Sequence, residues 1–233
     1  MAEVIGTLDG ATVAANLRRI EGEVARAAAG SGHGRAAPRV LAAVKYLAGT
    51  ELPKLAEAGV TLVGENRAQQ LAERHAGYGP LFEWHFIGQL QSRKVAMIAP
   101  LVTLIHSVAS RSAIAALERA RASAHSDLRI LIEVNVSGEP GKAGIDPGEL
   151  DDLIALSPLP VAGLMTMPPL AADGEASRPY FAALRRLADE RGLAELSMGT
   201  SQDYVVAAEE GATIVRIGTS LYIAGRPTRR ASG

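Results

Sequence analysis

The chain opens with a segment whose apolar residues recur at helical spacing. Val13, Leu17 and Ile20 lie on one stripe of a helix over residues 11–29, because spacings of three and four residues return to the same helical face. The glycine-, serine- and proline-rich stretch at 30–38 ends the periodic segment. The pattern therefore predicts one amphipathic helix at the start of the chain.

After this helix the pattern changes to short apolar runs that alternate with helical stretches. The apolar runs are 39–45, 60–65, 83–88, 101–108, 128–136, 159–165, 195–199 and 213–218. The helical stretches between them are 50–58, 66–75, 110–124, 148–156, 176–191 and 203–210. Continuous apolar strands that alternate with helices indicate a parallel sheet covered on both faces.

The number of these runs favours a closed sheet over an open one. Eight strand–helix units are what a (β/α)₈ barrel requires, whereas the first strand is not followed by the GxGxxG motif of an open nucleotide-binding sheet. No polar linker divides the 233 residues. We predict an α/β fold with one domain over 1–233, a single TIM barrel occupying 38–226, and an extra N-terminal helix.

Composition narrows the classes of partner. Hydrophobic residues make up 48% of the chain and charged residues 21%, which is enough for a large core. The formal net charge of −1 argues against nucleic acid. No apolar run approaches the roughly 20 residues of a membrane span, and the first ten residues lack the features of a secretory signal. These features predict a cytoplasmic protein without membrane or nucleic-acid partners.

Two residue types bear on metal and redox chemistry. The chain has no cysteine, and its five histidines include no pair at ligand spacing on one predicted helix. Thiolate and histidine ligands dominate zinc sites, so no metal site is predicted.

Lys45 is the first candidate for chemistry, because barrel active sites lie where strands end. Alternation places it on one face with Leu41 and Ala43, toward the barrel interior. A desolvated lysine there is a Schiff-base nucleophile. The alternative is a lysine that extends to solvent at the barrel edge, and the strand alone favours neither.

Arg216 is the second candidate, since it interrupts the apolar strand TIVRIG. A buried guanidinium without a partner is costly. Either a structural carboxylate such as Glu65 meets it, or a bound ligand offers it an acceptor atom.

The last two strands end in loops of small and hydroxyl residues. SMGTSQD places Ser201 after the seventh strand, and RIGTS places Gly218 and Thr219 after the eighth. Barrels frequently bind phosphate between these two loops, although ordinary helix N-caps would use the same residue types.

Several motifs together resemble a known family. They are AAVK ending at Lys45, GENRAQ at 64–69, WHFIGQLQSRK at 84–94, IHSV at 105–108, EVNVSGEPGKAGI at 133–145, GLMTM at 163–167, LSMGTSQD at 196–203 and VRIGT at 215–219. In this order and spacing, over about residues 10–226, the chain resembles the pyridoxal phosphate homeostasis protein family, whose barrel is similar to that of alanine racemase.

The resemblance implies a set of residues that contact pyridoxal 5′-phosphate (PLP). Lys45 would hold it as a Schiff base, the internal aldimine. Ser201, Gly218 and Thr219 would hold the phosphate, and Arg216 would face the pyridine nitrogen. Asn66 and Met165 would lie beside the cofactor, although a helix N-cap and a core methionine are the ordinary explanations of these two residues.

The chain departs from the family pattern near the proposed pocket. Val44 replaces the usual serine before Lys45, and Tyr46 begins a turn that usually starts with threonine. Thr200 and Ala109 stand where methionine and aspartate are common. These differences bear on the edge of the pocket rather than on the lysine, arginine and phosphate positions.

The resemblance also implies a function in cofactor homeostasis rather than catalysis. An arginine at the pyridine nitrogen only donates hydrogen bonds, which weakens PLP as an electron sink. The chain ends at Gly233 without the β-rich domain that supplies the opposing tyrosine in racemases. We therefore expect a monomeric, non-enzymatic protein that buffers PLP and delivers it to PLP-dependent client enzymes, with no catalytic residue assigned.

Two other hypotheses remain. A slow amino-acid racemase would use Tyr46 or His106 as its second base, although a hydrogen-bonded core role explains His106, and likewise His85. A Schiff-base aldolase without cofactor is less favoured, because strand six carries GLMTM and no lysine. The glycine-rich segment 137–144 is expected to form a flap, with Lys142 either solvated or reaching the pocket.

Overall fold

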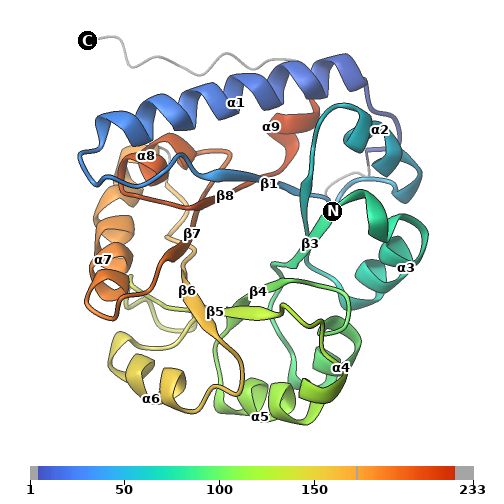
Figure 1. The fold of residues 1–233 in the computed structure, drawn as a ribbon. Coiled ribbons are helices and arrows are strands. Elements are labelled where there is room, and N and C mark those ends of the chain that lie inside the picture. Colours follow the sequence, from blue (N-terminus) through green and yellow to red (C-terminus); the bar gives the residue numbers. More distant parts are fainter. Residues whose placement is uncertain (1–4, 172, 224–233) are drawn as a thin grey trace.

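The apolar runs form the predicted barrel in a computed structural model that describes residues 5–171 and 173–223 (Figure 1). The strands are β1 (Arg39–Ala43), β2 (Leu62–Glu65), β3 (Glu83–Phe86), β4 (Leu104–Val108), β5 (Arg129–Glu133), β6 (Val161–Met165), β7 (Glu195–Thr200) and β8 (Ile214–Ile217). Neighbouring strands are parallel, and β8 pairs with β1 to close the barrel. The predicted (β/α)₈ fold is confirmed.

Helices surround the barrel and follow its strands in sequence (Figure 1). They are α1 (Gly10–Gly30), α2 (Leu52–Glu57), α3 (Ala68–Tyr78), α4 (Val95–Ile98), α5 (Arg111–Ala120), α6 (Leu150–Ala155), α7 (Arg178–Asp189), α8 (Tyr204–Glu209) and α9 (Thr219–Tyr222). The predicted helices are present, but the sequence interpretation missed the single-turn helix α4. The last three residues of the predicted barrel, 224–226, lie outside the described residues.

The extra N-terminal helix α1 covers one side of the barrel and lies along α8 and α9 (Figure 1). The Asp9 carboxylate caps its first turn by accepting hydrogen bonds from the N–H groups of Ala11 and Thr12. Its apolar stripe, including Val13 and Ile20, is buried as predicted. Among the described residues no helix is both long enough and apolar enough to cross a bilayer.

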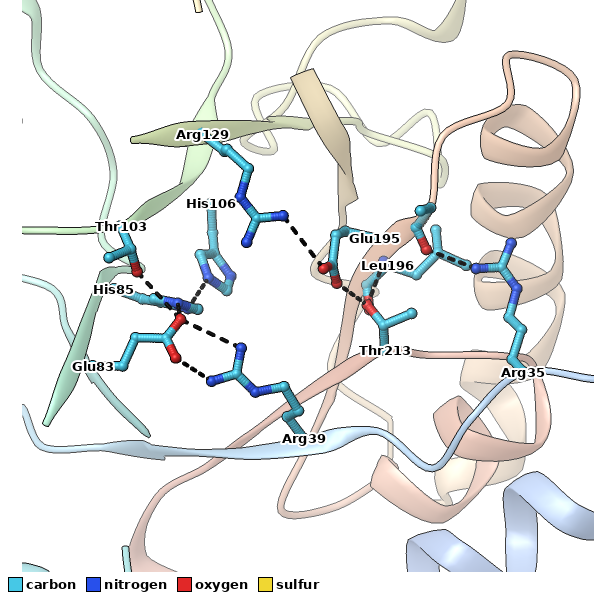
Figure 2. Close-up of polar contacts among 11 residues, drawn as sticks. Arg35, Arg39, Glu83, His85, Thr103, His106, Arg129, Glu195, Leu196 and Thr213 are labelled. Atoms are coloured by element: carbon cyan, nitrogen blue, oxygen red, sulfur yellow. Dashed lines mark hydrogen bonds and ion pairs between the residues drawn. The ribbon is translucent and has the colours of Figure 1, made fainter. Parts of the chain in front are cut away.

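Charged side chains line the N-terminal end of the barrel. Arg39, Glu83, Arg129 and Glu195 are the first residues of the four odd-numbered strands, so their charges alternate in sign around the opening. Arg39 pairs with Glu83, and Arg129 lies 3.7 Å from Glu195 (Figure 2). Alternate strands of such barrels contribute side chains to common layers, and here the outermost layer is ionic.

Apolar side chains occupy much of the barrel interior between this charged layer and the C-terminal end. The buried cluster there consists of Leu41, Leu62, Leu104, Leu131, Met165 and Ile214. These residues make much of the barrel interior a packed core. The C-terminal end therefore remains the place where a ligand could enter, as in other barrels of this fold.

Candidate functional site

The predicted site residues lie at the C-terminal ends of five consecutive strands around the barrel. Met165 ends β6, Ser201 follows β7, Gly218 and Thr219 follow β8, Lys45 follows β1, and Asn66 follows β2. The strand register pairs Leu41 with Arg216 and Ala43 with Gly64. Neighbouring parallel strands are about 4.8 Å apart. The pairing of β1 with β8 therefore brings the loop after the first strand next to the loop after the last strand.

Lys45 lies two residues beyond the end of β1, so the strand is shorter than the predicted 39–45. Its side chain is half-buried, and Nζ lies 4.6 Å from the centroid of the Tyr46 ring. Lys45 and Tyr46 line a cavity of about 780 Å³ together with residues of α3, including Gln70. The amine thus lies against an aromatic ring at the C-terminal end of β1, in a cavity that includes none of the other predicted site residues.

A buried arginine holds the turn that carries Lys45. Arg74 of α3 donates hydrogen bonds from Nη1 to the Val44 carbonyl at 2.8 Å and from Nη2 to the Leu47 carbonyl, and it pairs with the buried Glu65 carboxylate. Burial raises the pKa of Glu65, while Arg74 acts in the opposite direction. The sequence interpretation missed Arg74, because an arginine within an amphipathic helix ordinarily faces solvent.

The loops after β7 and β8 meet through a loop cluster of Ser201, Gly218, Thr219 and Ser220. Ser201 Oγ accepts a hydrogen bond from the Gly218 N–H at 3.3 Å and lies 2.7 Å from Ser220 Oγ. A Cβ at Gly218 would meet no atom within 4 Å, so the backbone there borders open space. Thr219 is exposed. Ser220 was not predicted, although it directly follows Thr219 in the RIGTS motif.

The turn that positions Ser201 depends on a glycine and an aspartate. Gly199 has φ of 90°, and a Cβ there would lie 2.5 Å from the Ala207 Cβ. Asp203 closes the turn by accepting a hydrogen bond from the Thr200 N–H at 2.7 Å. This local geometry fixes the backbone on either side of Ser201.

Arg216 is buried in the barrel interior and has no carboxylate within salt-bridge distance among the described residues. It donates hydrogen bonds to Ser197 Oγ at 2.6 Å and to the Thr166 carbonyl at 3.0 Å. The expectation that Glu65 could pair with it is wrong, because Arg74 occupies that carboxylate. Burial lowers the pKa of Arg216 to about 10, and the charges of Asp203 and Glu133 act in the opposite direction.

Asn66 is half-buried, and its side-chain Oδ1 is shielded from solvent with no hydrogen-bond partner among the described residues. The N-cap of α3 is Arg67, so the ordinary explanation of Asn66 as a cap is wrong. Gly88 brings the end of β3 against Asn66, since a Cβ there would lie 2.1 Å from the Asn66 carbonyl oxygen. Asn66 is therefore a buried acceptor held at the predicted site.

Met165 is buried and lines a mouth cavity of about 620 Å³ at the C-terminal end of the barrel. Glu133 and Lys142 line the same mouth cavity. Burial raises the pKa of Glu133, and Arg216 partly offsets this effect. The predicted flap at 137–144 thus borders the mouth cavity, where Lys142 Nζ lies 3.1 Å from Glu139 Oε2.

Comparisons with known proteins identify the family of the chain. The sequence matches the family "Alanine racemase, N-terminal domain" over residues 10–226. It is 38% identical over 217 residues to the pyridoxal phosphate homeostasis protein of Aquifex aeolicus, covering 88% of this chain and 95% of that protein.

Solved structures show the same fold. PipY of Synechococcus elongatus with PLP bound superposes with a TM-score of 0.75 at 28% identity, covering 90% of this chain and 99% of that one. Alanine racemase from Corynebacterium glutamicum gives a TM-score of 0.66 at 17% identity, covering 97% of this chain and 66% of that one, which shows a shared fold alone. The chain belongs to the pyridoxal phosphate homeostasis protein family, within the alanine racemase N-terminal domain family.

Proposed function

We propose that this protein binds PLP at the C-terminal end of its barrel, with Lys45 as the attachment point, and holds the cofactor for other proteins. The observation that carries this proposal is Arg216, a buried permanent cation that has only neutral hydrogen-bond partners among the described residues. A buried guanidinium of this kind offers strong donors to a ligand that carries acceptor atoms.

Other residues at the same end of the barrel offer groups for the rest of PLP. The loop cluster offers the hydroxyls of Ser201, Thr219 and Ser220, and the open space at Gly218 admits a bulky anion. The first N–H groups of a helix have no intrahelical acceptor, so the start of α9 adds donors for phosphate. Asn66 and Met165 would border the ring. The family and the PLP-bound PipY structure support PLP as the ligand.

The chemistry of the site favours holding PLP over using it. PLP supplies an aldehyde that reacts reversibly with a primary amine, and a ring that withdraws electrons best when its nitrogen is protonated. Arg216 can donate a hydrogen bond to that nitrogen but cannot accept one. It would therefore keep the nitrogen unprotonated and weaken any reaction that needs a carbanion.

Racemisation needs a second base, and the surroundings of His106 give little support for that role. The side chain is fully buried, and its two ring nitrogens contact His85 Nδ1 at 2.9 Å and Ser197 Oγ at 2.8 Å. With both nitrogens engaged, His106 has no free position for a substrate proton. Tyr46 remains as the other racemase candidate, stacked beneath Lys45.

The proposal includes the partners of the protein. Because a Schiff base between PLP and a lysine forms reversibly, we propose that the protein transfers PLP to PLP-dependent client enzymes, and that it does so as a monomer. Since the loop cluster and the flap at 137–144 lie at the same end of the barrel, that end would face a client during transfer.

Borohydride trapping tests the attachment point. Purified protein is titrated with PLP, followed by absorbance near the visible edge, then reduced and mapped by peptide mass spectrometry. We expect one reduced PLP adduct, on Lys45. Lys45→Arg keeps a cation over Tyr46 but lacks a primary amine, so it should lose the adduct, whereas Lys142→Arg should keep it. An unchanged adduct in Lys45→Arg would overturn the assignment.

A further inference from the structure

A line of hydrogen bonds crosses the barrel interior from its charged N-terminal end to Arg216. Glu83 Oε1 lies 2.8 Å from His85 Nε2, and His85 Nδ1 lies 2.9 Å from His106 Nε2. His106 Nδ1 then lies 2.8 Å from Ser197 Oγ, which accepts from Arg216 Nη1 at 2.6 Å. Figure 2 shows the lower part of this line, in which the two imidazoles connect to Glu83.

The two ends of the line fix the direction of the bonds at Glu83 and at Arg216, and neutral imidazoles fix the direction of the bonds between them. Arg216 has only donors, so the Ser197 oxygen accepts from it and the Ser197 proton is free to reach His106 Nδ1. Hydrogen bonds from His85 and Arg39 hold the pKa of Glu83 well below its usual range, so this carboxylate only accepts. His85 therefore donates from Nε2. A neutral His85 then has a bare Nδ1, so His106 donates to it from its own Nε2 and accepts from Ser197 at Nδ1.

This direction requires both histidines to be neutral. Each imidazole accepts one hydrogen bond at a bare Nδ1, and a charged imidazolium has no acceptor. Burial lowers the pKa of both side chains. Glu83 opposes this effect at His85, whereas His85 and Arg216 reinforce it at His106, and the more distant Arg39 and Arg129 lower the pKa of His85 further.

We propose that His85, His106 and Ser197 form a positioning relay, anchored by Glu83 at the opposite end of the barrel, that holds Arg216 in place to face the PLP ring nitrogen. The inference rests on the proposed PLP site. Because each bond polarises the next in the same sense, the relay links the guanidinium to a distant carboxylate without placing a negative charge beside it. An adjacent carboxylate would instead compete with the ligand for the same donors.

The geometry of Glu83 is consistent with its role as the anchor. Arg39 pairs with its carboxylate, and the Thr103 hydroxyl donates to Oε1 at 3.2 Å (Figure 2). These contacts fix the carboxylate so that His85 meets it from the barrel interior. Glu195 lies at the same end of the barrel and pairs with Arg129, but it makes no contact with either histidine among the described residues. It is therefore a matched control.

Imidazole ¹⁵N NMR on PLP-free protein tests the relay independently of PLP binding. At pH 7.5 we expect His85 and His106 to be neutral, each with its proton on Nε2 and a bare Nδ1. Assignment by His85→Gln and His106→Gln separates the two signals from the other histidines. A proton on Nδ1 of either residue, or a charged ring, would overturn the proposed direction.

PLP titration of two matched variants tests the effect on Arg216. Glu83→Ala removes the anchor far from the mouth and should weaken PLP binding about tenfold, the equivalent of one hydrogen bond to a charged group. Glu195→Ala removes a carboxylate from the same charged layer and should leave the affinity near that of the wild type. Equal losses in the two variants would mean that the charged layer acts only through stability.

Ser197 provides a second, local test. Ser197→Ala removes the link between His106 and Arg216 and should weaken PLP binding, whereas Ser197→Thr keeps the hydroxyl and should restore it. The ¹⁵N shift of His106 Nδ1 should change in the alanine variant and return in the threonine variant. Unchanged shifts in Ser197→Ala would contradict the relay even if PLP binding fell.

Failure of the proposed function gives a different result from failure of the relay. A wild-type protein that does not bind PLP would refute the proposed function, whereas the ¹⁵N measurement on PLP-free protein would still test the relay.

Discussion

At the scale of single residues, the candidate site depends on a glycine whose backbone conformation and surroundings disfavour any side chain. Gly199 adopts a left-handed φ of 90° directly before the loop that carries Ser201, and the space for a side chain there is already filled by Ala207. Gly192 has a similar φ of 64°, but a Cβ there would meet nothing within 4 Å. Comparing alanine substitutions at these two glycines therefore distinguishes the cost of the backbone conformation from the cost of the steric conflict.

Gly199→Ala should destabilise the protein more than Gly192→Ala. The left-handed backbone costs a non-glycine residue about 1–2 kcal/mol in either variant, and overpacking against Ala207 adds about 1–3 kcal/mol at position 199 alone. Urea denaturation monitored by circular dichroism measures both free energies of unfolding. Equal losses would show that the β7–α8 turn relaxes to accept a methyl group.

The neutral state of His106 predicts a specific pH dependence. Its pKa is well below the ordinary value in the folded protein, so below about pH 6.5 the unfolded chain binds more protons and stability falls as pH falls. His106→Gln removes this contribution. Between pH 7.5 and 5.5 the wild type should lose about 1.4 kcal/mol more unfolding free energy than the variant. Parallel pH profiles in urea denaturation would refute a buried neutral His106.

The sequence predicted residue types at the site better than their partners. Lys45, Ser201, Gly218 and Arg216 could be proposed as site candidates from their positions at strand ends or within an apolar strand, because such placement is visible in the sequence. The neighbours of Arg216 were not, since Ser197 and Thr166 come from other strands and only barrel closure brings them near.

At the scale of elements, α1 is tied to the end of the barrel by one buried amide. Asn16 Nδ2 donates to the carbonyl oxygens of Leu221 and Ile223 at 3.2 and 3.1 Å, where α9 ends. Since α9 follows directly on Gly218, this contact links the N-terminal helix to the loop cluster.

Asn16→Ala should leave the carbonyls of Leu221 and Ile223 without this donor. Burial of unsatisfied polar groups costs about 1–3 kcal/mol, so the variant should unfold at a lower urea concentration. Glu21→Ala, on the exposed face of the same helix, should change stability by less than about 0.5 kcal/mol. If Asn16→Ala matched Glu21→Ala, the Asn16 amide would make no measurable contribution to the stability of the fold.

Element boundaries mark the limit of the sequence interpretation. Periodicity over ten or more residues identified α1, α5 and α7, but a single turn such as α4 offers no repeat to detect. The end of β1 was placed two residues late because Val44 and Lys45 continue the alternation, while the Arg74 clamp that bends the chain there comes from α3.

At the scale of the whole molecule, closure of the barrel brings together segments that are distant in sequence. β1 and β8 pair, so the turn of Lys45 lies next to the loop cluster although more than 170 residues separate Lys45 from Gly218 in the sequence. A ligand that contacts both segments should therefore stabilise the folded barrel as a unit.

PLP should raise the free energy of unfolding of the wild type by about 2.7 kcal/mol at a concentration one hundred times its dissociation constant. Lys45→Arg should show a smaller gain at the same PLP concentration, because attachment through the primary amine is lost. Thermal or urea denaturation with and without PLP measures this difference. A gain in Lys45→Arg equal to that of the wild type would mean that PLP binds without Lys45.

A crystal structure of the protein with PLP tests the central claim most directly. We predict density continuous with Lys45 Nζ, the phosphate within hydrogen-bond distance of Ser201 and Gly218, and the ring nitrogen facing Arg216. Density attached to Lys142 or another lysine, or a phosphate bound away from the loop cluster, would contradict the account.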